Sequence, residues 1–203
     1  MELVDLSVVI NEDTPVYPGD PKVKIRPLGV FEKDSYNDHL ITIPNHVGTH
    51  IDAPWHMVAN GKTLDQIPID QFVGRGRLIQ VENKKFDLAA VKKAKIRQGD
   101  IVLFRTGMSD VYHKSEYFNY PEMPPEIANY LVGAKVKMVG VDMISPDKQP
   151  YKIHRILLSA DVLIIENLTN LEQLVGKEFT IYALPIKLQL DGAPARVIAQ
   201  IDD

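Results

Sequence analysis

The stretch NHVGTHIDAPWHM, residues 45–57, gathers side chains that bind metal ions. It holds three of the chain's six histidines together with one aspartate. These residues, His46, His50, Asp52 and His56, all occupy even positions, so an extended segment would place them on one face. In a helix His46 and His50 would meet at i, i+4, although the glycine and proline of the stretch disfavour a continuous helix. Either geometry brings at least two groups together, and imidazole with carboxylate is a ligand set for zinc, manganese or iron.

An interpretation without metal stays open for single histidines. Histidines beside glycine and proline also occur in surface loops, and we assign isolated His39 and His113 to that class. For the cluster, a chance gathering is the less favoured interpretation, although a motif alone is a hypothesis. Two or three local ligands rarely complete a catalytic metal site, so distant segments must contribute. Candidates are His154, in a helix-like segment, and Glu166, which directly follows the apolar run VLII at a strand end.

Composition narrows the classes of protein to consider. At 203 residues, with 45% hydrophobic and 25% charged residues, the chain predicts one globular domain spanning 1–203. A net charge of −4 gives no basic surface for nucleic acid. Without cysteine, any metal must be held by nitrogen and oxygen. The chain start lacks the features of a signal peptide, and no apolar run approaches a membrane span, so we expect a cytoplasmic protein without membrane partners.

Strand-like and helix-like segments follow a definite order along the chain. Short β-branched or alternating apolar runs predict strands at Val4–Ile10, Val23–Val30, Leu40–Ile43 and Arg77–Val81. From Asp87 onwards the two kinds alternate, with helices expected over 87–95, 124–134 and 151–160 and strands over 101–106, 135–143 and 161–167. Two last strands are expected over 179–188 and 195–201, joined by the turn DGAP. The alternation predicts a mixed α/β fold, with βαβ units around a largely parallel central sheet.

The sequence also resembles a known family. HVGTHIDAPWH matches the HxGTHxDAPxH signature of the cyclase family of metal-dependent hydrolases, which includes bacterial kynurenine formamidases and isatin hydrolases. TPVYPGDP, VGVDMISPD, HRILLSADVLIIENL, YALPIKL and DGAPARVIA resemble further landmarks of that family, in the same order. The resemblance covers nearly the whole chain and implies a fold of the swivelling β/β/α type. It also implies a homo-oligomer, a dimer or a tetramer.

The resemblance implies a role for each candidate residue. His46 and His50 would be metal ligands, and Asp52 would bridge two divalent ions, zinc or manganese. His154 and Glu166 would complete the site from the second half of the chain, with Glu166 also bridging. The last histidine of the signature, His56, would be the catalytic acid/base, a task that suits an imidazole.

The chain departs from the formamidase pattern at one position. Kynurenine formamidases commonly carry tryptophan where this chain has Tyr17, a residue that would stack on an aryl substrate. The resemblance implies a small-molecule amide substrate, and we favour an arylformamidase that converts N-formyl-L-kynurenine to L-kynurenine and formate. Hydrolysis of isatin or another cyclic or aryl amide is the first alternative. A non-catalytic metal-binding protein is the second, and the presence of His56 argues against it.

Overall fold

The computed structural model describes residues 1–202. Its strands are β1 (Glu2–Asp5), β2 (Lys24–Gly29), β3 (Asp38–Thr42), β4 (His50–Asp52), β5 (Val73–Gln80), β6 (Ile101–Arg105), β7 (Met138–Val141), β8 (Leu163–Glu166), β9 (Phe179–Pro185) and β10 (Gly192–Ile201). Its α-helices are α1 (Phe31–Asp34), α2 (Leu88–Lys93), α3 (Pro125–Gly133) and α4 (Lys152–Leu158). Short 3₁₀ turns lie between them, and the first of these, η1 (Pro54–His56), belongs to the histidine-rich stretch.

The main sheet closes on itself into a barrel. Its strand order is β1-β10-β4-β8-β7-β6-β5-β9, and β9 also pairs with β10, so seven strands form a ring with β1 attached to β10. The four strands β5, β6, β7 and β8 run parallel to one another, whereas β4, β9 and β10 pair antiparallel with their neighbours. Closure leaves these seven strands without a free edge and fixes the position of β4 beside β8.

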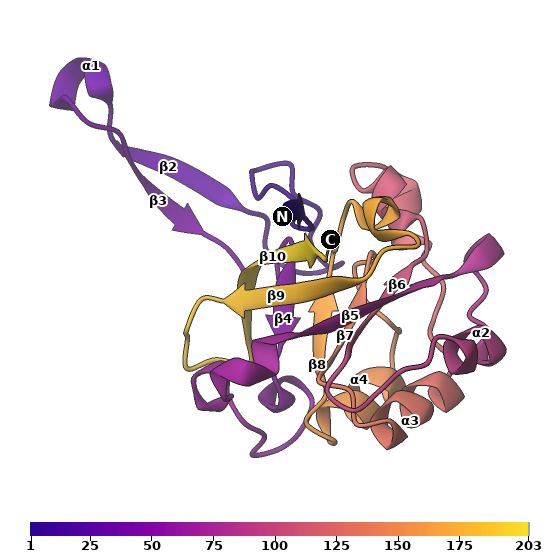
Figure 1. Cartoon of the computed structure of the whole chain (residues 1–203). Helices are drawn as coiled ribbons and strands as arrows, with labels where there is room; N and C mark the ends of the chain where they lie inside the picture. Colours follow the sequence, from indigo (N-terminus) through magenta and orange to yellow (C-terminus); the bar gives the residue numbers. More distant parts are fainter. Residues whose placement is uncertain (203) are drawn as a thin grey trace.

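Two hydrophobic cores lie on the two faces of the parallel strands. Along β6 the side chains alternate, because successive strand residues point to opposite faces. Val102 and Phe104 pack in the core that includes residues of α3 and α4, whereas Ile101 and Leu103 pack in the core shared with β9 and β10. Figure 1 shows α2, α3 and α4 gathered on one side of the sheet. Pro124 is the N-cap of α3 and Pro125 is its first residue, so the two prolines lie at the helix start, as the sequence predicts.

A hairpin arm projects from this body (Figure 1). β2 and β3 pair only with each other in a separate antiparallel sheet, and α1 lies at the tip of the arm. No residue of β3 is buried. Large apolar side chains are exposed along the arm, namely Leu28, Val30, Phe31, Tyr36, Leu40 and Ile41.

The mixed α/β fold predicted from the sequence is confirmed, with corrections in detail. The first predicted strand, Val4–Ile10, is wrong beyond Asp5, where regular pairing with β10 ends. DGAP is not a turn between two strands, since Gly192 already pairs with Asp52 and opens β10. The sheet is parallel only through β5–β8. The swivelling type that the resemblance implies stays a prediction. Within residues 1–202 no helix combines the length and apolar character needed to cross a membrane.

Candidate metal centre

Strand pairing places the first candidate ligands side by side. β4 lies between β8 and β10, and the register sets His50 opposite Glu166 and Asp52 opposite Gly192. Residues that face each other on paired strands carry their side chains on the same side of the sheet. Glu166 is the last residue of β8, so its carboxylate stands at the carboxyl end of the parallel strands, where the sequence predicts a functional group.

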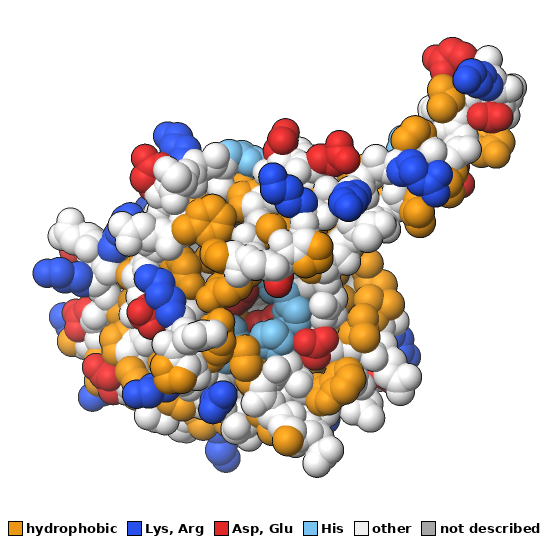
Figure 2. All heavy atoms as spheres, turned by 180° about the vertical axis from the view of Figure 1, so that it is seen from behind, with side chains coloured by type: hydrophobic (Ala, Val, Ile, Leu, Met, Phe, Trp, Pro, Cys, Tyr) orange, Lys and Arg blue, Asp and Glu red, His pale blue; other side chains and the backbone are white. Residues whose placement is uncertain are grey.

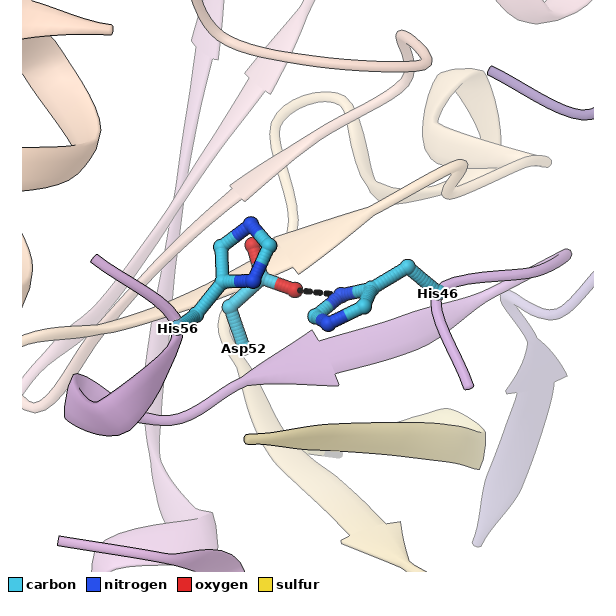
Figure 3. Close-up of side chains that lie close together, drawn as sticks. All are labelled: His46, Asp52 and His56. Atoms are coloured by element: carbon cyan, nitrogen blue, oxygen red, sulfur yellow. Dashed lines mark hydrogen bonds and ion pairs between the residues drawn. The ribbon is translucent and has the colours of Figure 1, made fainter. Parts of the chain in front are cut away.

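His46 and His56 reach the same place from outside β4. The extended face expected from even positions holds only for His50–Asp52, because the chain turns at Gly48. Gly48 has φ of +59°, and a Cβ there would lie 2.7 Å from Ile10 Cγ1, so a side chain is excluded. The turn brings His46 Nδ1 to 2.7 Å from Asp52 Oδ1 (Figure 3). His56, in the η1 turn, lies with its ring centroid 4.1 Å from that of His46.

Two carboxylates lie between two histidines at the centre of the site. His50 Nε2 is 3.3 Å from Asp52 Oδ1 and 3.3 Å from Glu166 Oε2. His154 Nε2 is 3.3 Å from Glu166 Oε1 and 3.6 Å from Asp52 Oδ2. Each carboxylate therefore faces His50 with one oxygen and His154 with the other. All four residues are buried.

The remaining nitrogens of these two histidines are held by acceptors. His50 Nδ1 donates to the Gly48 carbonyl oxygen at 2.8 Å, and His154 Nδ1 donates to Asp147 Oδ1 at 2.5 Å. A nitrogen that donates must carry hydrogen, so in the neutral rings the lone pair is on Nε2. Both Nε2 atoms point at the carboxylates, which is the orientation of a metal-ligating histidine supported by a second acceptor.

Several buried polar atoms of this cluster lack hydrogen-bond partners. They are His50 Nε2, Asp52 Oδ2 and Glu166 Oε1. A buried polar atom without a partner costs about 1–3 kcal/mol, so such atoms call for an explanation. Ligand atoms of His50, Asp52 and Glu166 lie within 4.8 Å of one another, and so do those of His46, Asp52 and His56. One or two divalent cations fit this donor set of nitrogen and oxygen.

Charge coupling within the cluster is strong. Burial opposes protonation of His46, but Asp52 and Asp191 outweigh it and raise its pKa to about 9. Burial likewise lowers the pKa of His50, while Asp52 and Glu166 raise it to about 10. Burial raises the pKa of Asp52, yet the neighbouring histidines hold it well below its ordinary value. Without a cation, His46 and His50 are therefore each protonated on both ring nitrogens at neutral pH. A cation that binds to one of these nitrogens displaces its proton.

The cluster opens into a cavity of about 290 Å³. Figure 2 shows the histidines at the base of a hollow, bordered by apolar side chains. Tyr17, predicted as a substrate contact, lines this cavity, and its hydroxyl lies 3.2 Å from that of Tyr151. Burial and then the Tyr151 hydrogen bond raise the pKa of Tyr17 to about 12, so it is a neutral phenol. Ile144 and Met57 add apolar surface to the wall of the cavity.

Sequence reasoning missed two aspartates of the site. Asp147 holds His154, and Asp191 Oδ2 lies 3.0 Å from both His46 Nε2 and His56 Nδ1. Both fall inside stretches that resemble family landmarks, VGVDMISPD and DGAPARVIA, and that was the only available signal. The six predicted ligand and acid/base residues do meet in one place, whereas the isolated histidines, at positions 39 and 113, are exposed and line no part of the cavity.

Comparison with known proteins points to one family. Residues 4–148 match the family model named Cyclase. An uncharacterized protein of Methanocaldococcus jannaschii is 34% identical over 205 residues, which cover 98% of this chain and 99% of that one. A kynurenine formamidase of Bacillus thuringiensis subsp. konkukian is 30% identical over 205 residues, covering 97% and 96%.

Comparison with solved structures points to the same family. The solved structure of isatin hydrolase A from Labrenzia aggregata, bound to benzyl benzoate, matches with a TM-score of 0.87 and 26% identity, covering 98% of this chain and 93% of that one. The family match spans well over half of the chain, and it includes the whole histidine-rich stretch. The chain therefore belongs to the cyclase family of hydrolases.

Proposed function

We propose that the protein is a metal-dependent amidohydrolase, with N-formyl-L-kynurenine as the favoured substrate. The observation that carries this proposal is the set of buried, unpartnered nitrogen and oxygen atoms that opens into a cavity. The similar kynurenine formamidase supports the substrate. Hydrolysis would release L-kynurenine and formate.

The resemblance to the family implies the ligand roles, and the closeness of the donor atoms supports them. His46, His50 and His154 would supply nitrogen ligands to one or two divalent ions, zinc or manganese. Asp52 and Glu166 would be shared between the two ions, because each carboxylate already faces two histidines. When bound, the ions activate a water molecule and polarise the amide carbonyl. The negative charges of the two carboxylates would offset the repulsion between two cations.

His56 would move the proton. It lines the cavity and its side chain is 23% exposed, so solvent and substrate can reach it. Its Nδ1 is bonded to Asp191, which leaves Nε2 as the nitrogen available for exchange. From there it can take a proton from the attacking water and give it to the leaving amine, a role that contributes about 10²–10⁴-fold in rate.

The cavity walls suit an aryl group. Tyr17 presents a neutral ring that can stack on a planar substrate, worth about 0.5–1.5 kcal/mol beyond area burial. A second candidate is hydrolysis of isatin or another cyclic amide, favoured by the fold match to isatin hydrolase A. A metal-binding protein without turnover is the candidate from another class, and a solvent-accessible histidine beside the ligands argues against it.

The test combines metal content with turnover. Elemental analysis of purified protein, as isolated and after reconstitution with zinc or manganese, should find one to two equivalents of divalent metal. Hydrolysis rates are then measured on N-formyl-L-kynurenine and on isatin. His56→Ala should keep the metal and lose turnover by about 10²–10⁴-fold. His113→Ala, which changes an exposed histidine outside the cavity, is the matched control.

Each outcome separates the candidates. Faster hydrolysis of N-formyl-L-kynurenine supports the formamidase, and faster hydrolysis of isatin supports the cyclic-amide alternative. Bound metal without turnover on either compound favours the non-catalytic candidate. Loss of metal in His56→Ala would make His56 a ligand, which the grouping of His46, Asp52 and His56 allows. Protein that binds neither zinc nor manganese would refute the proposal.

A further inference from the structure

We propose that Asp191 is the positioning residue of His56. Its carboxylate fixes the hydrogen of His56 on Nδ1 and so directs a basic Nε2 into the cavity. This inference rests on the proposed function, because it assigns a task to the partner of the proposed acid/base. Neither the signature stretch nor its spacing includes Asp191, which lies 135 residues beyond His56.

The carboxylate of Asp191 is held from several sides. Oδ2 lies 3.0 Å from His56 Nδ1 and 3.0 Å from His46 Nε2. Oδ1 accepts a hydrogen bond from Asn45 Nδ2 at 2.7 Å. The backbone carbonyl of Asp191 accepts from the Ala53 amide at 2.8 Å, three residues before His56. Asp191 is therefore tied to the η1 turn twice, by its backbone through Ala53 and by its side chain through His56.

Donor and acceptor chemistry sets the tautomer. An ionised carboxylate only accepts hydrogen bonds, so the nitrogen facing it must carry hydrogen. An aspartate is ordinarily ionised at neutral pH, and side-chain nitrogens of Asn45, His46 and His56 face this carboxylate. A neutral His56 with hydrogen on Nδ1 has its lone pair on Nε2. When Nε2 takes a proton, the same carboxylate stabilises the resulting imidazolium.

Gly192 makes this packing possible. A Cβ at that position would lie 2.5 Å from Cε1 of His46 and would displace the ring, so glycine lets the imidazole rest on the backbone next to Asp191. The ring of His46 then reaches the carboxylate with Nε2 and Asp52 with Nδ1. Both oxygens of Asp191 therefore have side-chain partners, whereas Asp52 has one oxygen without a partner.

The first arm of the test reads the tautomer directly. Protein labelled with ¹⁵N at histidine is prepared free of metal, and long-range ¹H–¹⁵N correlation spectra are recorded at a pH where His56 is neutral. His56→Ala identifies its signals by their absence. Wild-type protein should show hydrogen on Nδ1 of His56, and Asp191→Ala should shift population to hydrogen on Nε2. Asp70→Ala, at an exposed aspartate outside the cavity, should leave the spectrum unchanged.

The second arm reads catalysis at saturating metal, with the metal content of every variant determined. Asp191→Asn should lower kcat by about 10²-fold or more, up to the loss seen in His56→Ala, with a much smaller change in KM. Asp191 also contacts the proposed ligand His46, but at saturating metal that contact should not limit the occupancy of the site. The remaining effect of Asp191 should then act through His56, so the two losses should not multiply in the double variant.

The results that would overturn the inference are distinct from failure of the proposed function. An unchanged tautomer in Asp191→Ala would refute it, as would losses that multiply in the double variant. Loss of metal from Asp191→Asn at saturating metal, with the tautomer intact, would make Asp191 part of the metal site instead. If wild-type protein hydrolyses neither test compound, the proposed function fails, yet the tautomer of metal-free protein still decides whether Asp191 positions His56.

Discussion

Asp147 offers a sharp test of how this fold prepares a metal ligand. Its side chain is buried, with 3% of the residue exposed. Oδ1 accepts from His154 Nδ1 at 2.5 Å, and Oδ2 accepts from the Ile153 amide at 2.6 Å. Asp147→Asn keeps the shape of the side chain but replaces one acceptor with an NH₂ donor. We expect this single change to weaken metal binding.

The size of the effect follows from the two orientations of the new amide. If its NH₂ faces the Ile153 amide, two donors meet and a buried N–H loses its partner, at about 1–3 kcal/mol. If it faces His154, the imidazole must accept there, its hydrogen moves to Nε2, and the nitrogen that faces Asp52 and Glu166 can no longer bind metal. Loss of such a supporting hydrogen bond typically weakens metal affinity by about 10–100-fold, equivalent to about 1.4–2.8 kcal/mol.

The assay is competition with a chelating dye, alongside thermal unfolding in the presence of a chelator. Asp100→Asn is the matched control, because Asp100 is also buried and holds Arg75 at 2.6 Å in a structural ion pair. Both variants should lose stability, but only Asp147→Asn should lose metal affinity. Equal affinity in wild type and Asp147→Asn would refute the reasoning, since His154 would then need no fixed tautomer.

Two further predictions follow from the same site. Gly192→Ala should destabilise the protein by about 1–3 kcal/mol in thermal unfolding and weaken metal binding, because its Cβ would displace the His46 ring. Gly133→Ala, in α3 with open space around it, should instead stabilise by about 0.5–1 kcal/mol, and equal shifts in the two variants would contradict the packing argument. Because the pKa values of His46 and His50 are raised to about 9 and 10, both are protonated at pH 7 without metal. Burial lowers the pKa of the third imidazole ligand, His154, but its carboxylate partners hold it well above the ordinary value. Filling the whole site with metal at pH 7 should therefore release about three protons, and affinity should rise with pH at least up to about 9–10. Calorimetry in buffers of different ionisation enthalpy measures the release, and a buffer-independent enthalpy would show that the rings are already neutral.

Local signals in the sequence predict most of the elements but not the closed barrel. Alternation of helix-like and strand-like runs correctly indicates the parallel strands β5–β8. Closure depends on β9 and β10 pairing with each other and with strands distant in sequence, and periodicity contains no information about such partners. The predicted DGAP turn is wrong for the same reason. Glycine and proline favour turns locally, whereas the pairing of Gly192 with Asp52 makes the segment a strand.

The site shows the same division. The ligand types were evident from composition and spacing, and the strand end located Glu166. The shared face of the even positions failed outside β4, because the left-handed turn at Gly48 and the η1 turn replace the extended chain. The roles of Asp147 and Asp191 could not be predicted from the sequence pattern. A single aspartate carries no local sequence signal of its role. Only the folded backbone brings these two to within hydrogen-bonding distance of their histidines.

The hairpin arm has a consequence for local stability and solvent exchange. β2 and β3 contribute no residue to either hydrophobic core, and a two-stranded hairpin without such support is only marginally stable in water. On its own, the arm should open at a free-energy cost far below that of global unfolding, so its amide hydrogens should exchange rapidly. The homo-oligomer implied by the resemblance stays a prediction, and these amides report on it. If a second copy covers the apolar side chains of the arm, residues 24–42 become protected when copies associate, and dilution releases that protection.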